Sequence, residues 1–193
     1  MVGRFYFFGS GFMKNGMELF LSEGAIREHK EYLCELKHKA SILKKSGIEL
    51  EKAARGGRCG VPLDGKERSE IEKLLHDIKM HEIYFSSFGR SFIPCPKIKE
   101  RFGSENNFAY LVSRYAEKMA DGFVCVWSDG RGRLSFSDSR ELSRDAEIYL
   151  AIDLFEHAFF RDYGFKKDAY VRAALAHLDF SRINERENGK NKT

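Results

Sequence analysis

The first half of the chain contains two stretches whose core-facing residues recur at helical spacing. In the first stretch these positions step by three and four residues, which is the repeat of one face of a packed helix. They are Ile26, His29, Leu33, Leu36, Ala40 and Leu43. Ser22 precedes them and offers a side-chain cap for the first turn. The pattern predicts a long helix that begins just after Ser22.

The second stretch has the same steps, and its core-facing positions are Ile71, Leu74, Ile78, His81, Phe85 and Phe88. Residues 44–66 between the two stretches contain several glycines and Pro62, which favour a chain reversal. Asp64 and Glu67 have the spacing of a helix-capping pair. Together the two stretches predict an antiparallel helical hairpin.

Pro94 and Pro96 end this helical region, and shorter elements follow. We expect a small three-stranded antiparallel sheet with helices around it, because apolar strand-like runs are joined by a glycine-rich turn. The expected strands are 123–128, 133–137 and 146–152, and the expected helices are 106–120, 156–161 and 168–178. This order predicts the α+β class, with a hairpin domain over residues 1–92 and a second domain over residues 93–193.

Ionisable side chains interrupt the apolar pattern at a few positions. Asp153, Glu156 and His157 lie in the otherwise apolar and aromatic stretch 148–163, and one histidine interrupts each helical seam. A single such residue is most often a helix cap or a hydrogen-bonded core histidine, whereas several that meet in space are typical of a metal site. Because two seam histidines coincide with an Asp/His pair four residues apart, the pattern favours a metal site.

Composition argues against some kinds of partner and indicates a compartment. Lys and Arg exceed Asp and Glu by 33 to 29, a balance too mild to indicate a nucleic-acid partner. No apolar run approaches membrane-spanning length, and the first residues do not resemble a secretory leader, so we expect no membrane partner. The four cysteines show no metal-site spacing and are expected to be free thiols in a reducing compartment. We expect the cytoplasm, with the mitochondrion as the alternative.

The sequence resembles the iron/manganese superoxide dismutase family. Asp153-x-x-Glu156-His157-Ala158 is similar to that family's Asp-x-Trp-Glu-His-Ala signature, with Phe155 in place of Trp. His81-x-x-Tyr84-Phe85 is similar to the family's Asn-His-x-x-Phe-Trp, and Leu21-Ser22 has the family's spacing from His29. Downstream, Tyr163, Tyr170, Leu178 and Phe180 keep the family's register.

The resemblance implies an antioxidant enzyme that converts superoxide to oxygen and hydrogen peroxide at one iron or manganese ion. The ligands that it implies are His29, His81, Asp153 and His157. In the family, the residue equivalent to Glu156 pairs with the metal-binding histidine of the partner subunit, so the resemblance also implies a homodimer through the Glu156/His157 region.

Several positions depart from the family pattern. Leu33, Lys37 and Phe160 stand where the family has a gate histidine and two tyrosines, and the chain contains no glutamine to bond the metal's solvent. Asp77 occupies the position from which iron-type members supply that glutamine, and it is either a substitute for it or a surface residue. Lys37 either attracts superoxide or is simply solvated.

Two alternatives to the enzyme stay open. One is a catalytically weak or inactive superoxide dismutase-like structural or binding protein, which the lost gate and relay groups favour. The other is a helical hairpin with a structural zinc on the same ligands. The enzyme is the favoured interpretation, because burying three histidines and an aspartate without a metal is costly.

Overall fold

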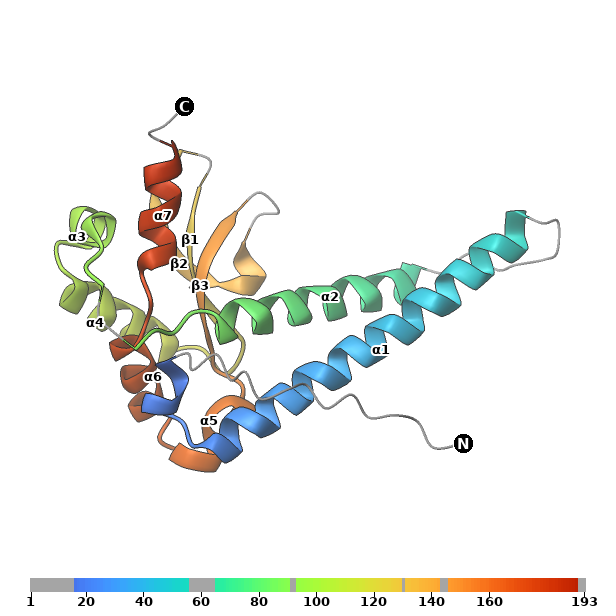
Figure 1. The fold of residues 1–193 in the computed structure, drawn as a ribbon, viewed down its shortest axis with the longest axis horizontal. Helices are drawn as coiled ribbons and strands as arrows, with labels where there is room; N and C mark the ends of the chain where they lie inside the picture. Colours follow the sequence, from blue (N-terminus) through green and yellow to red (C-terminus); the bar gives the residue numbers. More distant parts are fainter. Residues whose placement is uncertain (1–15, 56–64, 91–92, 130, 143–145, 191–193) are drawn as a thin grey trace.

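The computed structural model describes residues 16–55, 65–90, 93–129, 131–142 and 146–190 (Figure 1). Two long helices form an antiparallel hairpin, and a small sheet with shorter helices forms the rest, which confirms the α+β class. The helices are α1 (Glu23–Arg55), α2 (Gly65–Phe85), α3 (Pro96–Phe102), α4 (Glu105–Ala116), α5 (Glu156–Tyr163), α6 (Lys167–Ala176) and α7 (Ser181–Lys190), with short 3₁₀ helices at Gly16–Leu19 and Ser139–Glu141. The strands are β1 (Phe123–Ser128), β2 (Leu134–Asp138) and β3 (Glu147–Asp153).

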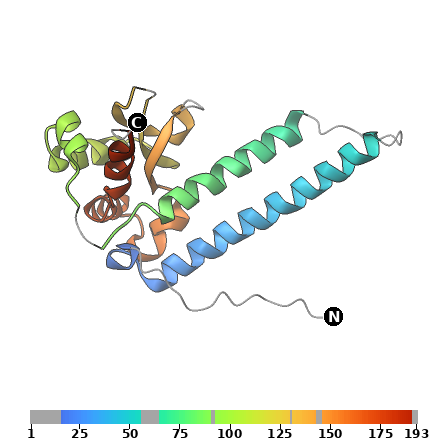
Figure 2. The same cartoon turned by 45° about the horizontal axis from the view of Figure 1, so that its top comes forward.

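The hairpin follows the predicted seam. The Ser22 hydroxyl accepts a hydrogen bond from the Ala25 amide at 3.2 Å and so caps the first turn of α1. Along α1 the residues buried at predicted positions are Ile26, His29, Leu33 and Ala40. Figures 1 and 2 show α1 and α2 running side by side and projecting away from the rest of the molecule.

The expected linker over residues 44–66 is wrong for its first half. α1 continues to Arg55, so it has 33 residues and is about 50 Å long at the usual helical rise. The reason is helix propensity: after Gly47 the segment is rich in Glu, Leu, Lys and Ala, which outweigh one glycine. Asp64, half of the predicted capping pair, lies outside the described residues.

The sheet has the order β2-β1-β3, and both pairings are antiparallel. The predicted turn between β1 and β2 is confirmed, and Val126 of the central strand lies opposite Phe136 on one side and Leu150 on the other. The first four residues of β1 are at most 3% exposed. Such a run, apolar at every position, is expected for a central strand covered on both faces.

The end of α2 is bonded to the C-terminal half of the chain. The Ala151 amide of β3 donates to the Ser87 hydroxyl at 2.9 Å, and the Gly89 amide donates to the His177 carbonyl at 3.0 Å. Phe88, which the pattern placed in the second helical seam, lies just after α2 and forms an isolated β-bridge with Leu178. These bonds fix the base of the hairpin against the sheet.

The apolar core is continuous from the base of the hairpin through the sheet to α6. Two short helices, α3 and α7, were not predicted, because each is only a few turns long and lies in a polar stretch. The proposed division at residue 92 stays a prediction. No helix of the described residues has the length and apolar character that crossing a membrane requires.

Candidate metal centre

Four ionisable side chains from four different elements converge where the hairpin meets the sheet. His29 comes from α1, His81 from α2, Asp153 from the last position of β3, and His157 from the first turn of α5. One nitrogen of each histidine and one oxygen of the aspartate lie within 4.8 Å of one another. We call these four residues the His/Asp quartet. They are the residues singled out from the sequence.

Local structure explains how the quartet meets. β3 ends at Asp153, which is paired with Phe123 of the central strand, and α5 begins three residues later at Glu156. The sharp change of direction brings His157 back beside Asp153. The two hairpin helices supply the other side of the cluster, because His29 and His81 lie on buried seam positions close to the base.

One carboxylate oxygen faces all three imidazoles. Asp153 Oδ2 lies 3.2 Å from His29 Nε2, 3.5 Å from His81 Nε2 and 3.3 Å from His157 Nε2. The other oxygen, Oδ1, accepts a hydrogen bond from the Phe155 amide at 2.8 Å. This bond orients the carboxylate so that Oδ2 points into the cluster.

The protonation of His81 is fixed by its neighbour. Its Nδ1 lies 2.7 Å from the Asp77 carbonyl oxygen, which can only accept, so Nδ1 carries the proton. In the neutral ring, Nε2 then presents a lone pair, and it points at Asp153 Oδ2 and at His157 Nε2, 3.2 Å away. A lone pair aimed at a carboxylate oxygen is repelled unless a cation lies between the two atoms.

Burial and charge shift the pKa values in the cluster. Burial lowers the pKa of His29 and of His81, and the nearby Asp153 carboxylate only partly offsets it. For Asp153, burial acts to raise the pKa, but interactions with His157 and His29 outweigh it, so the net pKa is lowered. These shifts favour the neutral form of His29 and of His81 and the ionised form of Asp153, which are the forms that bind a metal.

The donor set fits a single first-row transition-metal ion. Neither His29 Nε2 nor Asp153 Oδ2 has a hydrogen bond of good geometry among the described residues, although both atoms are buried. Ligand atoms lie about 2.1 Å from such an ion, so neighbouring ligand atoms are about 3 to 4 Å apart. The quartet has these separations, and its imidazole and carboxylate donors suit iron, manganese or zinc.

Aromatic rings surround the quartet. The His29 ring packs against Tyr84 and Phe85 at centroid distances of 5.0 and 4.9 Å, and Phe123 lies 5.0 Å from His81. The Tyr84 hydroxyl accepts a hydrogen bond from the buried Tyr170 hydroxyl at 3.1 Å. This shell excludes water from three sides of the cluster and leaves His157, whose side chain is 30% exposed, at its open edge.

Tyr32 was missed in the sequence. Its ring centroid lies 4.4 Å from that of His157 and 5.4 Å from that of His81, so it borders the open edge. Burial raises the pKa of its phenol, and the carboxylates of Asp77 and Asp153 add to the rise. The signal that could have revealed it is the spacing, because Tyr32 follows His29 by three residues and shares its helix face.

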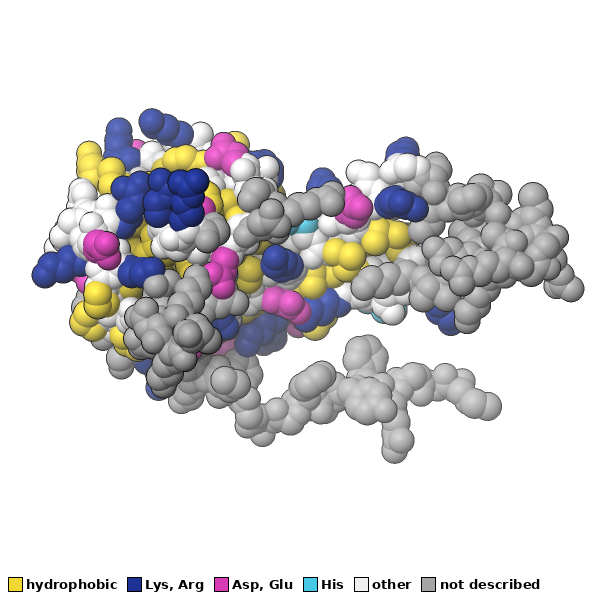
Figure 3. Space-filling view, turned by 90° about the horizontal axis from the view of Figure 1, so that it is seen from above, with side chains coloured by type: hydrophobic (Ala, Val, Ile, Leu, Met, Phe, Trp, Pro, Cys, Tyr) yellow, Lys and Arg dark blue, Asp and Glu magenta, His cyan; other side chains and the backbone are white. Residues whose placement is uncertain are grey.

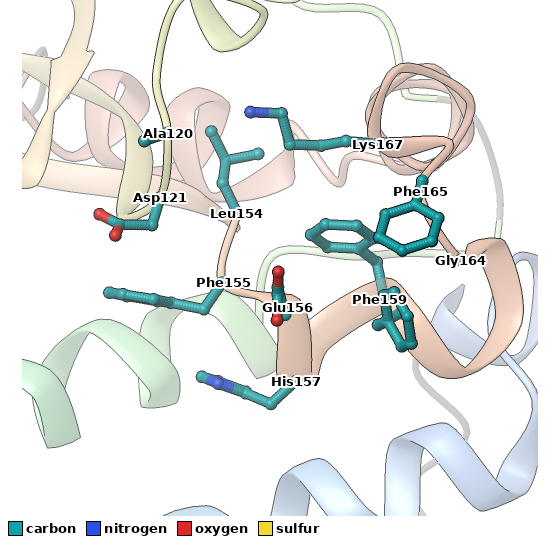
Figure 4. A pocket seen from close by; sticks show the side chains of 11 residues that line it. Ala120, Asp121, Leu154, Phe155, Glu156, His157, Phe159, Gly164, Phe165 and Lys167 are labelled. Carbon is teal, nitrogen blue, oxygen red and sulfur yellow. The ribbon is translucent and has the colours of Figure 1, made fainter.

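The other predicted site residues lie around the quartet with different surroundings. Lys37 forms an ion pair with Glu82 at 2.6 Å, with both side chains about half exposed. Asp77 is half-buried, and its carbonyl orients His81. Glu156 is exposed and lines a cavity of about 610 Å³ beside His157 (Figure 4).

Two of the three positions that depart from the family pattern differ in how far they are buried. Leu33 is buried in the hairpin seam, whereas Phe160 is 44% exposed and packs against Phe165. Neither side chain can donate or accept a proton. Among the positions compared with the family pattern, the gate and relay groups are therefore absent from this chain.

Comparison with known proteins agrees with this geometry. Residues 95–186 match the family described as iron/manganese superoxide dismutases, C-terminal domain. These 92 of the 193 residues, just under half of the chain, are similar to the C-terminal domain of that family.

A curated relative is the "Superoxide dismutase [Fe]" of Cupriavidus metallidurans, which is 28% identical over 130 residues. The similarity covers 62% of this chain and 66% of the relative, so the chain spans just under two thirds of the relative's length. The match over residues 95–186 contains Asp153 and His157 but not His29 or His81. The meeting of both hairpin histidines with Asp153 is thus an observation separate from that match.

Proposed function

We propose that this protein is a divergent member of the iron/manganese superoxide dismutase family and that it converts superoxide to oxygen and hydrogen peroxide at one iron or manganese ion held by the His/Asp quartet. The observation that carries the proposal is the convergence of three imidazole nitrogens and one carboxylate oxygen within 4.8 Å. A bound iron or manganese ion supplies the chemistry by alternating between its 3+ and 2+ states, so that one superoxide is oxidised and the next is reduced.

The residues of the chain prepare the site for an anion. Three neutral imidazoles and one carboxylate give the quartet a charge of −1, so a divalent or trivalent cation leaves the site positive. A positive site enclosed by apolar rings attracts a small anion strongly, because the surrounding medium screens the charge poorly. The Asp77 carbonyl and the Phe155 amide hold His81 and Asp153 in the orientation that binding requires.

A second candidate is a superoxide dismutase-like binding or structural protein with weak or no catalysis. The observation that favours it is the loss of polar groups at Leu33 and Phe160, together with the absence of glutamine from the sequence. A redox site without these groups lacks the family's route for protons and the amide that sets the reduction potential. The two candidates share the quartet and differ in turnover.

The deciding experiment pairs metal analysis with an activity assay. Protein is expressed in media supplemented with iron, with manganese or with zinc, and metal content and superoxide consumption are measured on the same preparations. One iron or manganese per chain with rapid consumption supports the enzyme, and the metal that gives turnover identifies the cofactor. Folded protein that holds either metal without turnover supports the binding protein. Zinc retained in preference to both supports the structural-zinc alternative.

We further propose that the enzyme is a homodimer through the surface around Glu156. The cavity beside Glu156 is bordered by Phe160 and Phe165, whose side chains are 44% and 92% exposed and whose rings lie 5.2 Å apart (Figure 4). Exposed phenylalanines next to a cavity are typical of a protein contact. The Glu156 carboxylate has no ion-pair partner among the described residues and is available to a second copy.

Light scattering after gel filtration tests the dimer. We expect a mass of twice 22.3 kDa for the wild type and a shift toward the monomer for Phe165→Ser and for Glu156→Gln. Tyr110→Ser is the control, because Tyr110 is 61% exposed on α4 and does not line the cavity. A monomeric wild type at micromolar concentration would contradict the dimer.

We propose a reducing compartment for this protein, the cytoplasm or the mitochondrial matrix. Cys34, Cys95 and Cys125 are free thiols in the structure, which is in keeping with such a compartment. Measuring the distribution of the full-length tagged protein between cell fractions tests this proposal.

A further inference from the structure

His157, the most exposed member of the quartet, contacts two aromatic rings from outside the quartet. The Tyr32 ring is one of them, at a centroid distance of 4.4 Å, and the Phe155 ring is the other, at 5.6 Å with its plane nearly parallel to that of His157. The other three quartet side chains are at most 2% exposed. The region around His157 is therefore the open side of the cluster, and these two rings border it.

The two bordering rings are held differently. Phe155 also packs against Phe123 at 5.7 Å, and its backbone amide donates to Asp153, so both its ring and its backbone are fixed. Tyr32 is 37% exposed, and its hydroxyl has no hydrogen-bond partner among the residues that the structure describes. Packing alone holds the Tyr32 ring in place, and a rotation about its side-chain bonds would uncover His157.

Neither Leu33 nor Lys37 gives this cover. Leu33 points into the hairpin seam and is buried, and the ammonium group of Lys37 is engaged by Glu82 at 2.6 Å. Tyr32, in contrast, follows His29 by three residues and so projects from the same face of α1 toward the quartet. Its ring reaches both His157 and His81.

We infer that Tyr32 is a specificity-determining residue that limits the size of the anion reaching the quartet. The inference rests on the proposed function. With the ring in place, a diatomic or triatomic anion passes the edge, whereas a bulky polycarboxylate chelator does not. An apolar layer over a metal site controls access in this way without altering the ligands.

The first test needs no metal. Metal-free wild type, Tyr32→Ala, Tyr32→Phe and the control Tyr110→Ala are treated with diethylpyrocarbonate, and labelling of each histidine is followed by mass spectrometry. We expect His157 to be labelled several times faster in Tyr32→Ala than in the other three proteins. His38, which is exposed on α1, serves as the internal standard and should react equally in all four.

The second test uses the metal-loaded protein. Manganese or iron is removed with EDTA, and azide binding is measured by absorption on the same samples. We expect Tyr32→Ala to lose metal to EDTA about tenfold faster than wild type, the lower end of the effect of changes around a metal site. Azide affinity should change much less than the release rate, because azide is small enough to pass the ring.

The outcomes separate this inference from the proposed function. Equal labelling and equal metal release in wild type and Tyr32→Ala would overturn it, and so would a Tyr32→Phe variant that behaves like Tyr32→Ala, because phenylalanine keeps the ring. A wild-type protein that holds metal but consumes no superoxide contradicts the proposed enzyme activity. The role of Tyr32 is then judged from the rates at which metal is released to EDTA. A wild type that holds no metal contradicts the enzyme, while the labelling result still decides whether Tyr32 covers His157.

Discussion

The base and the outer part of the helical hairpin carry the same sequence pattern but differ in what the pattern produces. Near the base, the seam residues Ile26, His29 and Leu33 of α1 are at most 9% exposed. Further out, Ala40 is buried, but Leu36 and Leu43 on the same seam are only half-buried, and neighbouring Ile42 is 52% exposed. The base packs against α5 and the sheet as well as against the other helix, whereas among the residues that the structure describes the outer part consists of the two helices alone (Figure 2).

This difference shows that the two-helix seam buries its residues less completely where nothing else packs on it. His38, on α1 beyond Leu33, is exposed. At the base, α5 and the sheet form a third layer. This layer excludes water from His29 and His81 and places Asp153 beside them. Metal binding is therefore expected at the base of the hairpin alone, and the following substitutions test this difference between the base and the outer part.

The largest effect is expected from His81→Ala compared with His38→Ala. Removing the His81 imidazole takes away one of four ligands and leaves the Asp153 carboxylate buried without its full set of partners. We expect His81→Ala to lose both metal and superoxide consumption, and His38→Ala to keep both. Metal analysis of the two purified variants checks this, and unchanged metal content in His81→Ala would contradict the ligand assignment.

A smaller difference is expected in the stability of Leu33→Ala and Ile42→Ala. Leu33 is 9% exposed at the base, so truncating it leaves a cavity and lowers the free energy of unfolding by about 2 kcal/mol. Ile42 is 52% exposed in the outer part, so the same truncation costs less than about 0.5 kcal/mol. Urea unfolding of the two variants gives both values. Equal losses would show that the outer part is as well packed as the base.

The stability of the metal-free protein should fall in mild acid because of the base histidines. Folding lowers the pKa of His29 and His81 below the ordinary 6.5, so the unfolded chain binds more protons there. Their contribution is present above pH 6.5 and is lost as the pH falls below it. Urea unfolding at about pH 7.5 and about pH 5.5 measures the loss.

The matched variants for this pH effect are His81→Gln and His38→Gln. We expect His81→Gln to have a smaller loss of stability between the two pH values than wild type, because one buried group no longer takes up a proton. His38→Gln should keep the wild-type loss. If His81→Gln and wild type lose the same amount, burial of His81 does not control the pH dependence.

The smallest effect is expected from two exposed lysines of α1: Lys37, whose partner Glu82 adjoins His81, and Lys39, whose partner Glu70 lies further along the hairpin. Lys37 pairs with Glu82 at 2.6 Å and Lys39 with Glu70 at 3.1 Å, and replacing either by alanine should cost less than about 1 kcal/mol of stability. At low ionic strength, Lys37→Ala should slow superoxide consumption and Lys39→Ala should not. Equal rates for both variants would place Lys37 among ordinary solvated residues.

Much of the fold was predictable because the apolar residues recur at regular spacings along the chain. The three- and four-residue steps predicted the buried face of α1 near the base, but on α2 they missed Met80 and Tyr84, which are fully buried. The strand–turn–strand pattern predicted β1 and β2 within a residue or two of their bounds. The length of α1 was not predicted, because one glycine next to polar residues resembles a linker although the helix continues through it. α3 was missed since its seven residues are too few to show a period.

The candidate site was predictable only in part. His29, His81, Asp153 and His157 could be singled out because each interrupts an apolar pattern, where an ionisable residue has a cost that must be offset. Tyr32 could not, because a tyrosine on a helix is ordinary and its role depends on which ring lies next to it. The same holds for the Asp77 carbonyl, since a backbone group has no signature in the sequence.

The sequence by itself determined the identity of the four candidate donors and the elements that carry them, because side-chain polarity and local spacing are properties of the chain. Only the tertiary structure decided that the donors meet within 4.8 Å, with one carboxylate oxygen facing three imidazoles and Tyr32 at the open edge. The physical reason is that separations between distant segments are set by how α1, α2, β3 and α5 pack, and no local pattern contains those distances.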